Sequence, residues 1–470
     1  HPCLSDADCS GSAQRCDATA SEENGGIPSF FCVDTSGKHA GKPCGPFGEN
    51  NASERAVAPG RCGPVHLTKP EDGGSTLIVD SVATSAFATD VVLTRRPTTG
   101  DEADGQPYRM FVPVRGDSSL HFIDTDGQGR LHCGQPESRG SCSEDYRVID
   151  GEKRDYDEDE PDETTIDVPV EPYGIAADPS GRVIVVAHQA GGKASAFLND
   201  WQKKPELVYI EGSLPTNPIG VAAIPQPKIV TALGEQYQAG YLITFRNDAS
   251  VHLLRFFDDG VLDGTPPEFG ESRPFLFDVA RTAITLNTSG TDSRGIVIDD
   301  DVREAAEEAC GDDADCLAEA AAVPLDVYVA NRSPNSLLIG QTDRRDADVA
   351  ASDLPTFHDN VPLTQGPSRV LIGSVTTASG AREKRIFVIC FDSALIYVYD
   401  PIRRRIESEI YTGRGPQALV FDPDPNVPLA YIGHFTDSYI GVVSLDQRFP
   451  KSYGSMLATL GTSTSPRASK

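Results

Sequence analysis

The sequence predicts an all-β fold that repeats a four-stranded antiparallel unit. Its 470 residues include 43 glycines and 35 prolines, which favour many turns, and 39% hydrophobic residues, enough for a large core. From about residue 75, short β-branched and aromatic runs alternate with Gly, Pro, Asp and Asn, as strands alternate with turns. One such unit cannot bury both faces of its strands, so neighbours must stack, and a closed ring of them is a β-propeller.

The repeat has two parts, and six copies occur at irregular spacing. The first part is a single apolar run such as "PYGIAADP" or "PIGVAAIP". The second is a pair of apolar runs joined by a polar turn, as in "GYLITFRNDASVHLLRF" and "RIFVICFDSALIYVYD". Six copies predict six or seven blades, because either "STLIVDSV" at 75–82 or "GSMLATLG" near the C-terminus could complete the last blade.

The chain divides into two predicted domains, a Cys-rich module at 1–64 and a propeller at 65–470. The module has too few apolar residues for its own core, so we expect disulfides to hold it. Insertions interrupt the propeller at 133–163, 258–290 and 300–323. The last, "DDVREAAEEACGDDADCLAEAAAV", is the clearly helical stretch, and "GDDAD" should break it into two short helices.

The eleven cysteines indicate an oxidising compartment. No C-x-x-C pair occurs, which argues against a zinc site, whereas local clustering favours disulfides. We expect Cys133–Cys142, Cys310–Cys316 and three further bridges within the module, whose 15 connectivities stay open. Cys390 in "RIFVICFDS" has no cysteine nearby in the sequence to pair with, so we expect it to be a buried free thiol. The module's six cysteines are Cys3, Cys9, Cys16, Cys32, Cys44 and Cys62.

Charge narrows the choice of partners. With 70 acidic and 41 Lys and Arg residues the net charge is −29, which disfavours nucleic acid and anionic membranes. No apolar run approaches the length of a spanning helix, so we expect no transmembrane span. The run "RDYDEDEPDE" reads as a solvated loop, or else as a dock for a basic partner or calcium.

The repeats also resemble a known family. "VYVANRSPNSL" and "YIGHFTDSYIGVVSLD" resemble the YVTN-type repeat of lactonase-like β-propellers, over about residues 75–460. The start "PCLSDADCSGSAQRC" resembles Cys-rich modules of bacterial surface proteins and lipoproteins. The resemblance implies an extracytoplasmic bacterial protein, periplasmic, on the outer-membrane surface or secreted, with a lipid anchor upstream as one means of attachment.

Basic residues recur where the turn between the second and third strands begins. Arg115, Arg246 and Arg332 occupy this position in three repeats, and His188 and His434 in two more. Connections into the first strand share the same end of a four-stranded unit and add Arg294 and Arg369. Arginine suits carboxylate or phosphate, and histidine can act as acid, base or metal ligand.

Three interpretations of these residues stay open. The arginines could bridge neighbouring blades or pair with the nearby Asp117 and Asp248, or they could line a mouth that binds an anion or a partner loop. A catalytic centre is the third, but no local catalytic signature occurs and we predict no catalytic residues. "DTDGQG" resembles the start of a calcium loop at Asp124 and Asp126, although it also suits a tight turn, and we expect no other cofactor.

These observations predict a non-enzymatic extracytoplasmic propeller that acts as a scaffold or protein-binding module in a cell-surface assembly. The alternative is a lactonase-like hydrolase, or a binder of a small anionic ligand, that uses the Arg- and His-lined mouth.

Overall fold

The computed structural model describes the repeats almost completely and the N-terminal 80 residues only in short pieces. The described residues are 14–17, 31–34, 65–67, 82–97, 107–125, 130–134, 142–153, 164–229, 237–258, 274–284, 292–344, 351–422, 424, 427–437 and 439–460. They fold as an all-β propeller of six blades, each built on four consecutive antiparallel strands, and the first and last sheets each have a fifth strand. The chain consists of two compact units. Unit 1 comprises His1–Val79 and Leu363–Lys470, and unit 2 comprises Asp80–Pro362.

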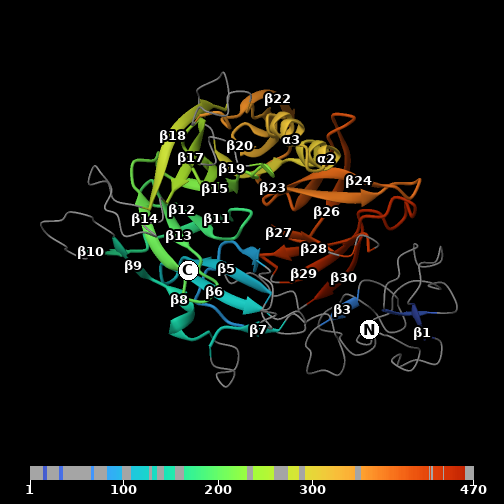
Figure 1. The fold of residues 1–470 in the computed structure, drawn as a ribbon. Coiled ribbons are helices and arrows are strands. Elements are labelled where there is room, and N and C mark those ends of the chain that lie inside the picture. The colour runs from blue at the N-terminus through green and yellow to red at the C-terminus, as the bar shows by residue number, and fades with distance from the viewer. Residues whose placement is uncertain are drawn as a thin grey trace, which may run out of the picture. The chain divides into compact units, whose positions relative to one another are not determined.

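Unit 2 contains sheets 1 to 4, which follow one another in colour order in Figure 1. Sheet 1 has β4 (Val92–Arg95), β5 (Tyr108–Val114), β6 (Ser119–Thr125), β7 (Leu131–His132) and β8 (Arg147–Val148). Sheet 2 has β11 (Pro172–Ala177), β12 (Val183–His188), β13 (Lys193–Leu198) and β14 (Glu206–Glu211). Sheet 3 has β15 (Pro218–Ala223), β16 (Ala239–Phe245), β17 (Ser250–Phe257) and β18 (Phe275–Ala283). Sheet 4 has β19 (Ser293–Asp299), β20 (Asp326–Arg332), β21 (Asn335–Gln341) and β22 (Thr356–Pro362).

Unit 1 contains sheets 5 and 6. Sheet 5 has β23 (Pro367–Thr376), β24 (Arg382–Cys390), β25 (Leu395–Asp400) and β26 (Arg405–Tyr411). Sheet 6 has β27 (Pro416–Phe421), β28 (Leu429–His434), β29 (Ile440–Ser444) and β30 (Met456–Leu460). The strand β3 (Val65–Leu67) pairs in parallel with β30, beyond the fourth strand. The C-terminal candidate therefore completes the last blade, and most of the competing segment at 75–82 lies outside the described residues.

The hydrophobic cores lie between neighbouring sheets of one unit. In unit 2, Phe111 and Ile184 belong to a core shared by sheets 1 and 2, and Val185 and Tyr241 to one shared by sheets 2 and 3. Middle strands such as β12 are buried along their whole length because both of their faces are covered. Continuous apolar runs such as "VIVVA" are the sequence signature of such doubly covered strands.

The insertions take three forms. The disulfide Cys133–Cys142 closes the loop between β7 and β8. These two short strands pair with different parts of β6, and together they take the position of the fourth strand. A hairpin of β9 (Asp150–Lys153) and β10 (Thr164–Asp167) follows, and the 3-10 turn η5 (Glu144–Tyr146) precedes β8. The segment at 259–273 lies outside the described residues.

The helical insertion folds as predicted into two short helices. These are α2 (Asp301–Cys310) and α3 (Ala314–Ala321), joined by the disulfide Cys310–Cys316. Asp313 caps α3 by accepting hydrogen bonds from the backbone N–H groups of Asp315 and Cys316, each at 3.1 Å. The aspartates that break the helix therefore start the next one.

Within the N-terminal 80 residues, the strands β1 (Gln14–Asp17) and β2 (Phe31–Asp34) pair with Cys16 opposite Cys32. The other cysteines predicted to bridge there lie outside the described residues. Cys390 is a buried free thiol, as predicted. Among the described residues, no helix is both long and apolar enough to cross a membrane.

Candidate functional site

One backbone hydrogen bond recurs in all six sheets and defines an equivalent end of each. A residue at or directly after the end of the second strand donates its N–H to the carbonyl of a residue that precedes the first strand. We call the end of a sheet that carries this bond its B–C end. The pairs are Arg115 to Phe87, Gln189 to Glu171, Arg246 to Asn217, Arg332 to Asp292, Phe391 to Gly366 and Phe435 to Gly415, at 2.7–3.0 Å.

This register corrects the predicted alignment of the histidines with the arginines. His188 and His434 lie one residue before the donor position, opposite Pro172 and Pro416 in the ladders. Successive side chains of a strand point to opposite faces, so a shift of one residue moves a side chain to the other face. The donor positions that follow them hold Gln189 and Phe435 instead.

Both histidines are buried and committed to hydrogen bonds. His188 is fully buried, its Nε2 lies 2.8 Å from Ser195 Oγ, and burial lowers its pKa to about 4. His434 Nε2 accepts from the Gly413 N–H at 3.1 Å, and burial lowers its pKa as well. At neutral pH both rings are therefore neutral, and neither adds a positive charge to the B–C end.

Arg115 and Arg246 pair with acids of the next sheet, whereas Arg294 pairs with an acid beside its own strand. Arg115 lies 2.9 Å from Glu171, which precedes the first strand of sheet 2. Arg246 Nε lies 3.7 Å from Asp292, which precedes the first strand of sheet 4, and Arg294 contacts the same carboxylate at 2.6 and 2.8 Å. These pairs support the interpretation that the repeated arginines bridge blades.

The predicted partners of these arginines differ from the observed ones. Asp117 accepts from Ser119 and lies near His121 and Arg147, and Asp248 accepts from Ser250. Both aspartates therefore organise the turns that contain them. Because acids accompany the arginines, the B–C end of unit 2 is not a mouth of unpaired cations.

The remaining candidates occupy less informative positions. Arg332 ends β20 and is partly buried, and Arg369 lies opposite Ile389 on β23, in unit 1. Asp124 is engaged by the buried guanidinium of Arg109, at 2.6 and 3.2 Å, and Asp126 lies outside the described residues. In the described part of the chain, no group of three or more His, Cys, Asp or Glu side chains could hold a metal ion.

Phe87 and Val170, which we call the patch, are exposed apolar side chains on two neighbouring segments at the B–C end of sheets 1 and 2, and the sequence pattern did not indicate them. Phe87 is 67% exposed and Val170 is 59% exposed. Thr89 donates to the carbonyl of Tyr173 at 2.8 Å, which holds the segment containing Phe87 beside the start of β11. The ion pair of Arg115 and Glu171 links the same two segments, so apolar side chains and an ion pair share one surface.

Phe87 also has an unusual backbone conformation. Its φ is +65°, in the left-handed region that side chains other than Gly, Asn and Asp rarely adopt. The equivalent positions of sheets 2, 3, 5 and 6 hold Glu171, Asn217, Gly366 and Gly415, which also have positive φ, so the repeat itself sets this conformation. Phe87 and Glu171 are the two of these residues that are neither Gly nor Asn, and the sequence alone does not reveal the exposure of Phe87.

Comparisons with known proteins add little about chemistry. No protein-family model matches the chain, and no curated protein does. A functionally unknown protein from Desulfotomaculum acetoxidans has 13% identity and a TM-score of 0.43 over 82% of this chain and 92% of its own. A protein from Lactobacillus plantarum has 11% identity and a TM-score of 0.42 over 78% and 84%. A candidate 6-phosphogluconolactonase from Bacteroides uniformis has 12% identity and a TM-score of 0.37 over 67% and 71%. At these values the resemblances do not bear on activity.

Proposed function

We propose that this chain is a non-enzymatic, extracytoplasmic propeller that binds a protein partner through the B–C end of sheets 1 and 2. The observation that carries the proposal is Phe87, a bulky side chain that is 67% exposed in the left-handed backbone region. The repeat sets this backbone conformation, as it does at Glu171 in sheet 2, and a phenylalanine so exposed at this place contributes little to the core. An exposed phenylalanine held in this way suits an anchor for a partner.

The surroundings of Phe87 have the composition of a protein interface. Phe87 and Val170 supply an apolar centre, and the half-exposed ion pair of Arg115 and Glu171 supplies a polar rim. We infer that the partner contributes apolar side chains over Phe87 and polar groups against the ion pair. In unit 1 the equivalent end likewise carries an aromatic side chain, Phe435, which is 66% exposed.

The chemistry of the basic residues favours binding over hydrolysis. The buried, neutral His188 has a pKa near 4, too low for a general base that works near neutral pH. The arginines Arg115, Arg246 and Arg294 already pair with acids. A lactonase-like reaction would need a catalytic acid or base, and the carboxylates at this end, Glu171 and Asp292, are paired with arginines.

Disulfides support the proposed compartment. Cys133–Cys142 and Cys310–Cys316 close short loops in unit 2, and such bridges persist in oxidising environments. We propose a periplasmic, outer-membrane or secreted location, in which the protein acts as a scaffold within a surface assembly. The proposal includes a bacterial origin and the Cys-rich module as a tether or second contact.

Affinity capture with matched variants tests the proposal. The tagged protein is used to capture partners from membrane and secreted fractions of the source cells, alongside Phe87→Glu and Phe277→Glu. Phe277 lies on β18, is 52% exposed and is remote in sequence from the patch, so it is a matched control. We expect Phe87→Glu to lose the partner and Phe277→Glu to retain it, with both variants folded by circular dichroism. Equal capture by both would refute the proposed surface.

A further inference from the structure

A pocket in unit 2 lies at the end of the sheets opposite to the B–C end. It is lined by the turn after the first strand of sheet 2, the segment between the first two strands of sheet 3, and the connection between the last two strands of sheet 4. Its volume is about 280 Å³, close to the lower limit of about 300 Å³ for small-molecule sites. None of the residues that the sequence singled out as site candidates lines it.

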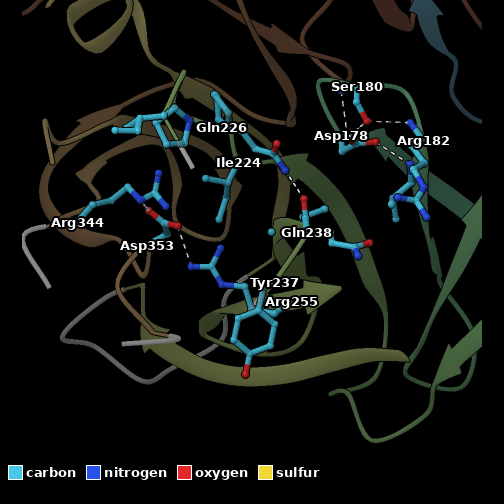
Figure 2. Close-up of a pocket in the computed structure, with 16 residues that line it drawn as sticks. Asp178, Ser180, Arg182, Ile224, Gln226, Tyr237, Gln238, Arg255, Arg344 and Asp353 are labelled. Atoms are coloured by element: carbon cyan, nitrogen blue, oxygen red, sulfur yellow. Dashed lines mark hydrogen bonds and ion pairs between the residues drawn. The ribbon is translucent and has the colours of Figure 1, made fainter. Parts of the chain in front are cut away.

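One wall of the pocket carries more positive than negative charge. Asp353 is fully buried and lies between two buried arginines, with one carboxylate oxygen 2.7 Å from Arg255 Nη2 and the other 2.9 Å from Arg344 Nε. Figure 2 shows these three side chains together on one side of the pocket. One carboxylate thus faces two guanidinium groups, and this cluster has a net positive charge.

Arg344 supplies the unused hydrogen-bonding capacity of this wall. Its side chain is only 5% exposed, and its Nη1 has no hydrogen-bond partner among the described residues. An unpaired donor of a buried guanidinium is unfavourable, since it has lost water and gained nothing in exchange. Burial lowers the pKa of Arg344 against the attraction of Asp353, and the positive charges of Arg255 and Arg303 lower it further.

The rest of the pocket is mostly apolar or hydrogen-bonded, apart from Gln238, whose Oε1 has no hydrogen-bond partner among the described residues. Ile224, Pro225, Pro227 and Tyr237 contribute apolar or aromatic surface. On the opposite wall, Asp178 accepts hydrogen bonds from Ser180 and from the Val183 N–H, and Arg182 pairs with Asp258 at 3.0 Å.

Behind the wall formed by residues 224–229, Arg303 and Glu307 of α2 hold the segment in place. Arg303 donates to the Pro225 carbonyl at 2.9 Å, and Glu307 accepts from the Lys228 N–H at 3.1 Å. Arg303 also lies 3.4 Å from the partly exposed Asp300, so this side of the segment carries two acids and one arginine.

We propose that this pocket binds a small organic monocarboxylate, with its carboxylate on Arg344 and its apolar part against Ile224 and Tyr237. A guanidinium offers paired donors that match a carboxylate. A monocarboxylate suits a single guanidinium whose Nη1 has no hydrogen-bond partner among the described residues, whereas a phosphate ester carries about 1.5 to 2 negative charges. The small volume restricts the ligand to a compact acid.

Benzoate and its neutral analogue benzamide are the probes for this site. Isothermal titration of the full chain in chloride-free buffer should show saturable benzoate binding, and benzamide at the same concentration should not bind. The two molecules have nearly the same shape, so the comparison isolates the charge. Equal binding of both, or no binding of benzoate, would overturn the proposal, as would binding of inorganic phosphate in place of benzoate.

Variants locate the binding. Arg344→Gln should weaken benzoate binding about 10- to 100-fold, the range expected when a hydrogen bond to a charged group is lost. Arg414→Gln, outside the residues that line the pocket and 61% exposed at its side chain, should bind benzoate as the parent does. If Arg344→Gln binds as tightly as the parent, the site lies elsewhere and the proposal fails. The comparison of benzoate with benzamide in the unaltered protein decides the matter even if Arg344→Gln does not fold.

Discussion

Asp353→Asn is the substitution that best tests the buried charge cluster. Asp353 is fully buried, and it is the carboxylate that neutralises Arg255 and Arg344 at 2.7 and 2.9 Å. Removing one partner of a buried ion pair costs about 3–5 kcal/mol, because the remaining charge is left uncompensated. Asp353→Asn removes the carboxylate that both guanidinium groups share, so we expect a loss of unfolding free energy of about 3 kcal/mol.

Arg344→Met is the matched substitution, and its expected outcome is different. It leaves Arg255 and Asp353 as a balanced pair and replaces a buried guanidinium with an apolar side chain of similar length. The unfolding free energy should therefore change by less than about 1.5 kcal/mol, the usual limit for a tolerated swap of this kind.

Chemical denaturation followed by circular dichroism measures both changes, with Lys203→Met as the control. The side chains of Lys203 and its partner Asp200 are 79% and 55% exposed, so the loss of this ion pair should change the unfolding free energy by no more than about 1 kcal/mol. If Arg344→Met destabilises the protein as much as Asp353→Asn, the cluster has no excess positive charge. The argument for an anion in the pocket would then lose its basis.

Three further predictions concern acid stability, thiol reactivity and packing. Burial raises the pKa of Glu407, but the hydrogen bonds from Arg385 outweigh it and lower the pKa below its ordinary 4.5. The stabilisation is therefore present above that pH and lost below it, so the stability deficit of Glu407→Gln should shrink as the pH of urea titrations falls from about 5 to 3. Cys390 is buried and its pKa is raised to about 12, so iodoacetamide at pH 8 should label it only after unfolding, as peptide mapping would show; labelling of the native protein would contradict this. Gly220→Ala should lower the unfolding free energy by about 1–3 kcal/mol, since its Cβ would collide with the backbone of sheet 4, whereas Gly212→Ala, in open space, should not; equal effects would contradict the packing.

The fold was predictable because its signals are local and repeated. Runs such as "VIVVA" are buried on both faces of a strand, and the break at "GDDAD" ends one helix and caps the next at Asp313. Two disulfides were also predictable, because two cysteines only a few residues apart in one loop have few other partners. The blade count required the structure, because two segments far apart in the sequence could each have completed the last blade. The pairing of β29 with β30 shows that the C-terminal segment does so.

The candidate site was only partly predictable. Sequence spacing placed Arg115 and Arg246 at equivalent positions, but a one-residue error put His188 in the same set, and such an error reverses the direction of a side chain. The partners Glu171 and Asp292 come from the next sheet, and no local pattern indicates them. The pocket could not be predicted from the sequence either, because the residues that line it come from three different sheets.

Site-specific photocrosslinking tests the proposed function most directly. A benzophenone amino acid replaces Phe87 in one variant and Phe277 in another, and each is irradiated in source cells that express it. The proposed function predicts that position 87 crosslinks to one protein partner in high yield and that position 277 does not. Crosslinks of equal yield at both positions, or none at position 87, would contradict it.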